Sequence, residues 1–365
     1  MRSSARVSWI RPTVTRTARK VAGMEPNAQT KFVLEPEDEY PHEPESASNY
    51  NESMYLNTFD LAQRYGAWFR IGNRINEGYA EVSVCIYLPD GRVGFMFGRP
   101  EITTNMAMDA GGLTIEVIEP FKQLRLTYDG QVCLLDDPSQ MANPREAFTT
   151  NPFVTAQVTL DIRGVSPMWG GKTVNADGSD LDTDPDTSFA RAHYEQHIAT
   201  TGSITVEGLT LEMNGVGLRD KSWGPRHWQA IEWYRWLPIS FGEDFAMMLT
   251  TQGRGGNVGT TGMVLENGEY HIVRDVTIDS EWDDRYYQTS MHCVAKTDHR
   301  EYVVDGEVLS LIPLRHRRTD PDGNQLHTRI TEAMTRFTCD GRVGLGMSEY
   351  LDQIVDGRPT GPDVS

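Results

Sequence analysis

Hydrophobic and polar residues alternate along most of the chain from Asn51 onward. In residues 81–88, EVSVCIYL, every second residue is apolar, and residues 154–162, VTAQVTLDI, repeat the pattern. A period of two is typical of a β-strand with one buried and one exposed face. Convincing amphipathic helices are scarce. The pattern therefore predicts many half-buried strands.

Short motifs that end in glycine separate the predicted strands. Glycine readily adopts the positive φ of tight hairpins, so each motif predicts a turn. The motifs are Pro89-Asp90-Gly91, Tyr128-Asp129-Gly130, Glu207-Gly208, Asn267-Gly268, Asp305-Gly306 and Asp340-Gly341. Short strands joined by hairpins over this length predict an all-β fold, most simply two antiparallel barrels or sandwiches in tandem with few helices.

The chain has 365 residues, enough for two domains. Residues 1–48 lack apolar periodicity: they begin basic and Ser/Thr-rich, similar to a transit peptide, and end acidic and Pro-rich. We expect them to form a disordered arm that contributes nothing to folding. Residues 49–187 are the predicted first barrel and residues 188–355 the second, with the polar stretch Asn175–Ser188 as the linker.

Composition limits the partners and the compartment. The net charge of −18 repels nucleic-acid phosphates, and the chain contains no apolar run of the roughly 20 residues that a membrane span needs. We therefore expect neither nucleic-acid binding nor integral membrane association. The cysteines are far apart and lie in strand-like segments, so buried free thiols and a cytoplasmic location are predicted. They are Cys85, Cys133, Cys293 and Cys339.

Residues 215–228, GVGLRDKSWGPRHW, combine glycines, charges and tryptophans in a pattern that fits neither an ordinary strand nor an ordinary loop. Gly215 and Gly217 would permit a kink or bulge where backbone approaches backbone. In a regular strand, Arg219 and Asp220 would point to opposite faces. The segment therefore indicates either a functional site or a buried structural element. In the structural interpretation, Arg219 and Asp220 pair with each other and hold a corner of the aromatic core.

Large aromatic residues are concentrated in and just after this motif. Such density is typical of a site for a lipophilic ligand, and indole rings can stabilise positive charge that develops on it. We expect the aromatic side chains and the arginines of this region to contact the substrate. The candidates are Arg219, Trp223, Arg226, Trp228, Tyr234 and Trp236.

The segment HYEQH places His193, Glu195 and His197 on one face of a regular strand. The two histidines would then be roughly 13 Å apart, too far to share a metal ion, so no metal is expected. In apolar surroundings Glu195 would have a raised pKa and could act as a general acid. A hydrogen-bonded polar cluster that bridges strands is the alternative.

Four segments together resemble a branch of bacterial proteins related to carotenoid hydratases of the hydroxyneurosporene synthase type and to AttH-like proteins. They are NESMYLNTFD, GNRINEGYAEVSVCIYLPDGRVGFMF, HYEQH and GVGLRDKSWGPRHW. The resemblance implies two lipocalin-like β-barrels in tandem and reactions on isoprenoid or polyketide-like molecules without an organic cofactor. The family motif, G-x-G-x-x-D-H-x-W-G, has a histidine where this chain has Lys221. If the family histidine is the proton donor, then Glu195, His193 or His197 would have to donate the proton in this chain.

These features lead to one main hypothesis. Glu195, Asp220, His193 and His197 are the candidate catalytic residues of a cofactor-independent hydratase, isomerase or cyclase acting on an isoprenoid, steroid-like or other lipophilic molecule. A non-catalytic carrier or sensor of such a molecule is the alternative, and a scaffold with two filled barrels is a third possibility. Ionisable groups within about 4 Å in one cavity favour the enzyme, a purely apolar lining favours the carrier, and the lack of a cavity favours the scaffold.

Overall fold

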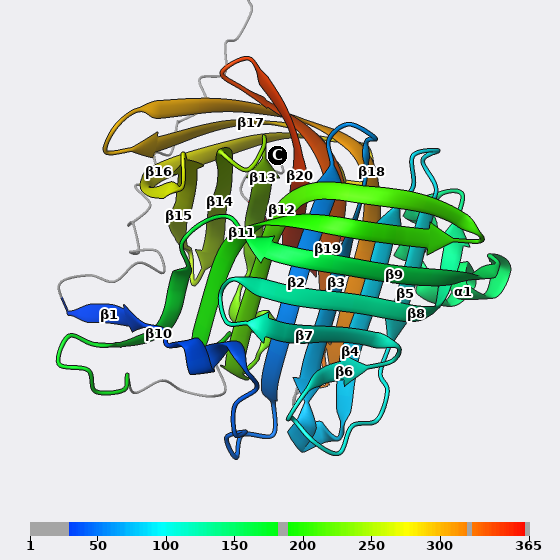
Figure 1. Ribbon diagram of the computed structural model, residues 1–365, viewed down its shortest axis with the longest axis horizontal. Coiled ribbons are helices and arrows are strands. Elements are labelled where there is room, and N and C mark those ends of the chain that lie inside the picture. The colour runs from blue at the N-terminus through cyan, green and yellow to red at the C-terminus, as the bar shows by residue number, and fades with distance from the viewer. Residues whose placement is uncertain (1–28, 182–188, 320–322, 362–365) are drawn as a thin grey trace, which may run out of the picture.

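The computed structural model describes residues 29–181, 189–319 and 323–361, which form two large antiparallel sheets (Figure 1). The first sheet contains β1 (Thr30–Val33), β2 (Tyr50–Asp60), β3 (Tyr65–Arg74), β4 (Tyr79–Tyr87), β5 (Val93–Gly98), β6 (Met108–Ala110), β7 (Leu113–Glu119), β8 (Gln123–Leu135), β9 (Phe153–Gly164), β10 (Trp169–Asn175), β11 (Ala192–Val206) and β12 (Leu209–Pro225).

The second sheet follows the first along the chain. Its strands are β13 (Trp233–Ser240), β14 (Phe245–Arg254), β15 (Asn257–Glu266), β16 (Glu269–Trp282), β17 (Gln288–Thr297), β18 (Glu301–Thr319), β19 (Gln325–Cys339), β20 (Arg342–Val355) and β21 (Arg358–Pro359). The helices are α1 (Pro144–Thr150) and the short 3-10 turns η1 (Pro36–Glu39), η2 (Ile75–Glu77), η3 (Pro138–Ala142) and η4 (Trp228–Ala230). No helix among these residues is long and apolar enough to cross a bilayer.

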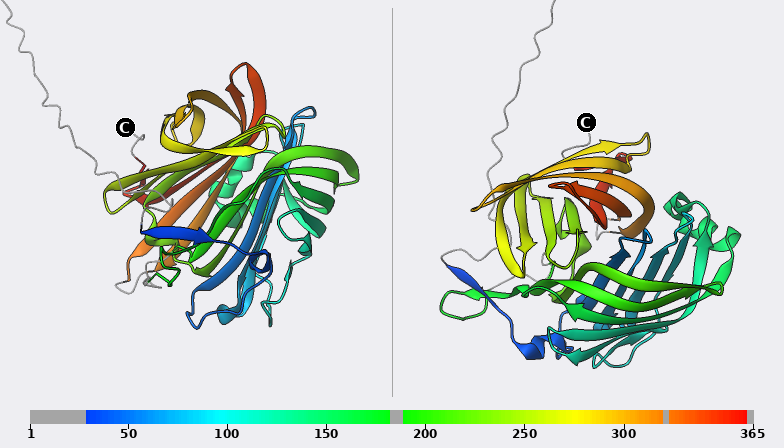
Figure 2. Two further views of the ribbon diagram at one scale, coloured as in Figure 1. Left: turned by 60° about the vertical axis from the view of Figure 1, so that its left-hand side comes forward. Right: turned by 45° about the horizontal axis from the view of Figure 1, so that its top comes forward.

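Both sheets close on themselves, as the sequence predicted. In the second, β13 pairs with β14 and with β20, so the strands from β13 to β20 form an eight-stranded barrel. In the first, β9 pairs with both β8 and β11 and closes a ring with β12, β2, β3, β4 and β5. Figure 2 shows the second barrel, coloured yellow to red, lying against the first, coloured blue to green.

Hydrophobic clusters fill both barrels and also the contact between them. Val84 belongs to the cluster inside the first barrel and Leu249 to the cluster inside the second. A third cluster joins Tyr55 and Cys85 of the first barrel to Met347 of the second. Strand β4 is therefore buried on both faces rather than half-buried, because its outer face packs against the second barrel. All four cysteines are buried free thiols.

The boundary between the sheets differs from the predicted domain boundary at residues 187 and 188. Strands β11 and β12, which include residues 215–225 of the GVGLRDKSWGPRHW motif, pair with β9, β10 and β2 and so belong to the first barrel. The division falls between Pro225 and Trp233. The expected linker, Asn175–Ser188, instead connects β10 with β11 of the same sheet; its residues 182–188 lie outside the described part of the chain.

Part of the predicted N-terminal arm is folded. Residues 1–28 lie outside the described chain, but β1 pairs with β10, and η1 places Glu39 in the interior. The prediction was wrong for this segment because Glu39 forms an ion pair with Arg219, a residue far along the chain, which local composition does not reveal.

Four of the six predicted turns lie at hairpins, and two lie inside strands. Asp129-Gly130 is within β8 and Asp305-Gly306 is within β18. At Gly130 a side chain would meet the Tyr128 hydroxyl group, and at Gly306 it would meet the Met291 sulfur atom. These glycines therefore make room for neighbouring side chains rather than turn the chain.

Candidate functional site

A cavity of about 850 Å³ lies between the two barrels rather than inside either one. The outer faces of β2, β3, β4, β11 and β12 form one wall, and those of β13, β14, β19 and β20 form the other. A volume of several hundred cubic ångströms is typical of a small-molecule site. Aromatic side chains cover much of the surface, including those of Tyr55, Trp68, Phe95, Phe148, Trp228 and Trp236.

The β11–β12 hairpin brings the ionisable groups of the first wall together. Its turn at Glu207-Gly208 sets a register in which Glu195 lies directly opposite Asp220, with His193 next to them on the same face. No register shift interrupts β12 in either of its long ladders, so the expected kink at Gly215 and Gly217 is absent along this strand. A Cβ atom at Gly217 would lie 2.0 Å from the Asn57 carbonyl oxygen, so close backbone approach explains this glycine.

Three of the four predicted catalytic residues form one cluster at the cavity. The His193 Nε2 atom lies 3.7 Å from Glu195 Oε1 and 3.8 Å from Asp220 Oδ2. These distances correspond to ion pairs rather than direct hydrogen bonds. Burial alone would lower the pKa of His193, but the Asp220 and Glu195 carboxylates outweigh it and raise this pKa.

Glu195 has the most distinctive environment in the cluster. Its side chain is 1% exposed, and burial raises its pKa to about 7, although His193 and Trp236 partly oppose this shift. The Trp236 Nε1–H donates a hydrogen bond of 3.0 Å to Oε1. Oε2 has no hydrogen-bond partner among the described residues. One carboxyl oxygen is thus held in place while the other remains available.

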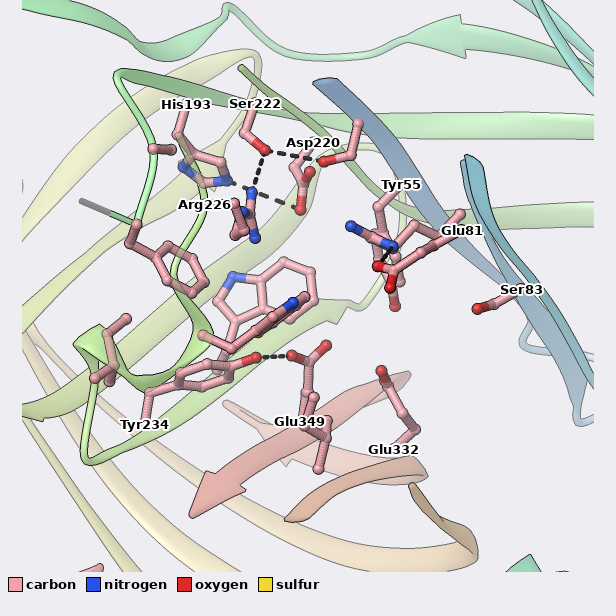
Figure 3. A pocket seen from close by; sticks show the side chains of 18 of the residues that line it. Tyr55, Glu81, Ser83, His193, Asp220, Ser222, Arg226, Tyr234, Glu332 and Glu349 are labelled. Carbon is pink, nitrogen blue, oxygen red and sulfur yellow. Dashed lines mark hydrogen bonds and ion pairs between the residues drawn. The ribbon is translucent and has the colours of Figure 1, made fainter. Parts of the chain in front are cut away.

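The predicted substrate contacts divide between the cavity lining and the opposite face of β12. Arg226, Trp228, Tyr234 and Trp236 line the cavity, as Figure 3 shows for Arg226 and Tyr234. Arg219 and Trp223 do not line it: they lie on the opposite face of β12.

His197 also lies outside the cavity lining, although it is on the same strand as His193 and Glu195. Its Nδ1 atom is 3.0 Å from the Tyr270 hydroxyl group. Burial lowers the pKa of His197 to about 4, so this ring is neutral near pH 7. The structure therefore does not bring His197 to the candidate site.

The opposite face of β12 anchors the N-terminal segment. Arg219 donates two hydrogen bonds to Glu39, of 2.6 and 2.9 Å. The Lys221 ammonium group, which is fully buried, contacts Glu52 at 2.7 Å. The interpretation of an Arg219–Asp220 structural pair is therefore wrong, because Arg219 pairs with Glu39 instead. Lys221, which stands at the histidine position of the resembled motif, points away from the cavity.

Sequence comparison assigns this chain to a family. Residues 35–354 match the family described as Domain of unknown function (DUF7064). The chain belongs to the DUF7064 family. No curated protein sequence matches it.

A solved structure shows that this DUF7064 protein has a known fold. An AttH-like protein from Nitrosomonas europaea superposes with a TM-score of 0.51 and 10% identity, over 88% of this chain and 96% of that protein. CghA aligns with a TM-score of 0.46 and 11% identity, over 85% and 90% of the two chains. Kievitone hydratase from Nectria haematococca aligns with a TM-score of 0.47 and 9% identity, over 83% and 89%. The AttH-like match confirms the fold expected from the sequence, two lipocalin-like β-barrels.

The second wall of the DUF7064 cavity contains a carboxyl pair that the sequence analysis missed. Glu332 on β19 and Glu349 on β20 are direct cross-strand neighbours, and the Tyr234 hydroxyl group donates a hydrogen bond to Glu349 (Figure 3). Burial and the mutual proximity of the two groups raise the pKa of Glu332 well above its usual range, and burial raises that of Glu349 to about 7. Glu332 Oε2 has no partner among the described residues. We infer that the pair retains a proton near neutral pH.

A signal for this pair was present in the sequence of the DUF7064 protein. Glu332 and Glu349 each interrupt an apolar strand pattern, and each lies eight residues from the nearer residue of the predicted Asp340-Gly341 turn. A two-residue hairpin pairs residues at equal distances from its turn. The register therefore predicts that the two carboxyl groups meet on one face.

The ionisable groups of the DUF7064 cavity do not form an evident metal site. Within the described ranges, no group of three or more His, Cys, Asp or Glu residues is arranged to hold a metal ion.

Proposed function

We propose that this protein is a cofactor-independent acid–base enzyme, a hydratase, isomerase or cyclase, that acts on a lipophilic small molecule in the cavity between the barrels. The observation that carries the proposal is Glu195: a buried carboxyl group with a pKa of about 7, one oxygen fixed by Trp236 and the other without a protein partner. A general acid or base works best when its pKa lies near the operating pH.

Proton transfer would begin at Glu195. Near pH 7 this group is present in both protonation states, so it can donate a proton to a substrate double bond or accept one from the adjacent carbon. When Glu195 donates a proton, the negative charge that it acquires lies 3.7 Å from His193, whose pKa is raised. The imidazolium stabilises that charge, and Asp220 in turn stabilises the imidazolium.

The cavity wall is suited to a substrate that becomes cationic during the reaction. Protonation of an isolated alkene generates positive charge on carbon, which aromatic faces stabilise when water is excluded. Trp228 and Trp236 lie in the same cavity as Glu195, and the rings of Tyr55 and Trp236 pack edge to face with their centres 5.5 Å apart. The same arrangement serves hydration, isomerisation and cyclisation, which differ in the fate of the cation.

The carboxyl pair on the second wall would complete the proton balance. Glu332 and Glu349 come from the second barrel, whereas Glu195 comes from the first, so a substrate between the barrels would meet ionisable groups on both sides. Figure 3 shows Asp220 and His193 of the first wall and Glu332 and Glu349 of the second. In an isomerisation, one wall gives a proton to the substrate and the other removes one. In a hydration, water adds to the cation and then gives one of its protons to an ionised carboxylate of the cavity, either Glu195, which is thereby reprotonated, or the pair on the second wall.

A carrier or sensor is the second candidate function. The aromatic lining would suit it, and a carrier needs no proton transfer. The ion pairs of 3.7 and 3.8 Å within the cavity favour the enzyme, because ionisable groups at this separation inside a cavity are typical of an active site.

Isotope labelling of a lipophilic extract tests the proposal. The extract is incubated with the protein in H₂¹⁸O or in D₂O and analysed by mass spectrometry. A hydratase introduces ¹⁸O into a product, whereas an isomerase or cyclase introduces deuterium without ¹⁸O. We expect Glu195→Gln to abolish the labelled product and Glu212→Gln, which neutralises an exposed carboxylate on the same hairpin, to leave it unchanged. Equal labelling by wild type and Glu195→Gln would contradict the assignment.

A further inference from the structure

The cavity concentrates positive charge in an acidic protein. Although the net charge of the chain is −18, seven arginines line the cavity, and the described lining contains no lysine. The guanidinium group differs from the lysine ammonium group in presenting planar pairs of donors, which match the geometry of carboxylate and phosphate groups. The charge that the arginines bring to the cavity is therefore opposite in sign to the net charge of the protein.

The carboxyl groups of the cavity only partly offset these arginines. Burial raises the pKa of Glu195, Glu332 and Glu349, so these groups are neutral or only partly ionised near pH 7. Glu81 is ionised, because arginines lower its pKa despite its burial, but it is shared between Arg70 at 3.5 Å and Arg99 at 2.9 Å. Asp220, the fifth carboxyl group of the lining, lies 3.8 Å from His193 Nε2. Because three of these five carboxyl groups are neutral or only partly ionised, the seven arginines leave the cavity lining with an excess of positive charge.

Arg226 is the most buried of the seven lining arginines. Its side chain contacts the Phe189 ring at 4.3 Å and the Trp228 ring at 5.2 Å, which fix the plane of the guanidinium group. Nη2 donates a hydrogen bond of 2.5 Å to Ser222, and no carboxylate of the described residues forms an ion pair with the group. The residue is only 7% exposed. Nε and Nη1 therefore remain as oriented donors at the cavity wall.

A second guanidinium group approaches the same ring. The Arg70 Cζ atom lies 5.8 Å from the centre of Trp228, on which Arg226 also packs. Burial and the nearby Arg70 lower the pKa of Arg226 to about 10, so the arginine remains protonated at neutral pH while its charge is incompletely compensated. An anion bound here would relieve that excess charge.

We propose that Arg226, supported by Arg70, binds the anionic group of an amphipathic ligand, a carboxylate or a phosphate, whose apolar part lies along the aromatic wall of the cavity. The inference deepens the proposed function and rests on it for the identity of the ligand as substrate. The binding itself does not depend on turnover.

The position of Arg226 also indicates which part of the ligand reacts. Its hydrogen-bond partner Ser222 lies two residues from Asp220 on the same face of β12, and Ser222 pairs with His193 across the hairpin (Figure 3). An anionic group held by Arg226 therefore lies beside the His193–Glu195–Asp220 cluster. The atoms that receive or lose a proton are then the carbons close to the anionic group, not those at the far end of the ligand.

Matched amphiphiles test the proposal without knowledge of the natural ligand. Binding of decanoate, decyl phosphate, decanol and decyltrimethylammonium is measured by calorimetry at one ionic strength. We expect the carboxylate or the phosphate to bind at least about 10-fold more tightly than the alcohol, because a hydrogen bond to a charged group contributes about 1.5–3 kcal/mol. The comparison of decanoate with decyl phosphate identifies the preferred anion. Equal affinity for alcohol and anions, or tightest binding of the ammonium compound, would overturn the proposal.

Variants locate the anion site. We expect Arg226→Gln to weaken anion binding about 10- to 100-fold and to leave decanol binding unchanged, and Arg226→Lys to weaken anion binding less. Arg125→Gln, which changes an exposed arginine outside the cavity, is the control. If Arg226→Gln does not fold, Arg70→Gln and the four wild-type affinities decide the question. Glu195→Gln should bind decanoate with the wild-type affinity. If this variant loses turnover but keeps anion binding, the catalytic role of Glu195 and the anion site at Arg226 are tested separately. Unchanged anion affinity in folded Arg226→Gln would contradict the site.

Discussion

The two faces of strand β12 place buried charges in contrasting surroundings. On one face, Arg219 and Lys221 have hydrogen-bond partners: Arg219 bonds to Glu39 and Gln196, and Lys221 bonds to Glu52 and two backbone carbonyl groups. On the other face, Asp220 and Glu195 lie 3.8 and 3.7 Å from His193, and Glu195 Oε2 has no hydrogen-bond partner among the described residues.

This difference distinguishes charges that stabilise the fold from charges that are available for chemistry. Glu39 accepts four hydrogen bonds, two from Arg219 and one each from the Phe121 backbone and the Tyr194 hydroxyl group. A buried charged group that has all its hydrogen-bond partners is stable in that protonation state, so it does not readily exchange a proton with a ligand. A buried carboxyl oxygen without a partner, such as Glu195 Oε2, lowers stability and is retained where a ligand supplies the missing contact. Substitutions on the two faces should therefore change stability in opposite directions.

The largest effect is expected from Glu39→Gln. The substitution leaves the buried Arg219 guanidinium without a counter-ion, which costs about 3–5 kcal/mol of unfolding free energy. Urea denaturation at pH 7 measures the loss. Glu37→Gln, an exposed acid on the same 3-10 turn, is the matched control and should change stability by less than about 0.5 kcal/mol. A loss below 1 kcal/mol for Glu39→Gln would show that this face does not anchor the fold.

The next effect, of opposite sign, is expected from Glu195→Gln. The folded-state pKa of Glu195, about 7, lies above its ordinary value, so wild-type stability from this group is complete below about pH 4.5 and is lost as the pH rises through 7. Glutamine does not ionise and avoids this loss. We therefore compare the unfolding free energy of the variant with that of wild type at two pH values. We expect this difference to be roughly 3 kcal/mol more favourable to the variant at pH 8.5 than at pH 4. Denaturant titrations at the two pH values measure it. A constant difference between the proteins would mean that Glu195 titrates normally.

Alternation predicted part of one side of the candidate site. Period two placed His193 and Glu195 on one face of β11, together with His197, which does not line the cavity. The Glu207-Gly208 turn was also predicted, but the register that follows from it, with Asp220 opposite Glu195, comes from the structure. Alternation also placed Arg219 and Asp220 on opposite faces of β12. Local patterns determine these relations because they depend only on strand geometry and on the length of the turn.

The remaining features of the site depend on tertiary contacts. Which face of β12 lines the cavity is decided by the docking of the second barrel, and hydropathy does not indicate it. Glu39 lies in an acidic, Pro-rich segment that is typical of exposed chain, and only its pairing with Arg219 makes it part of the interior. Glu332 and Glu349 meet through a register that the sequence contains, but their burial follows from barrel packing.

A smaller gain is expected from Glu349→Gln on the second wall. Removal of one ionisable group from the Glu332–Glu349 pair ends their mutual repulsion, so stability above pH 7 should increase by about 1–2 kcal/mol. The number of protons released between pH 5 and pH 9, measured by potentiometric titration, should fall relative to wild type. Tyr234→Phe removes the hydrogen bond to Glu349 but keeps both carboxyl groups, so it should not reduce this proton count. An unchanged proton count in Glu349→Gln would contradict a group that titrates in this range.

The smallest effect is expected from Trp236→Phe, which tests how the reactive face is tuned. The indole N–H donates to Glu195 Oε1 and so favours the ionised carboxylate, which lowers the pKa that burial has raised. Phenylalanine keeps an aromatic ring but cannot donate this bond, so the Glu195 pKa should rise above 7 by less than about one pH unit, equivalent to about 1 kcal/mol. The carboxyl stretching band in infrared titrations of wild type and variant reports the midpoint directly, without a substrate. Trp228→Phe is the control, because Trp228 lines the same cavity but packs on Arg226 and Arg70. A shift in both variants would indicate a general change in the polarity of the cavity, and a downward shift in Trp236→Phe would mean that the indole stabilises the protonated form of Glu195 instead.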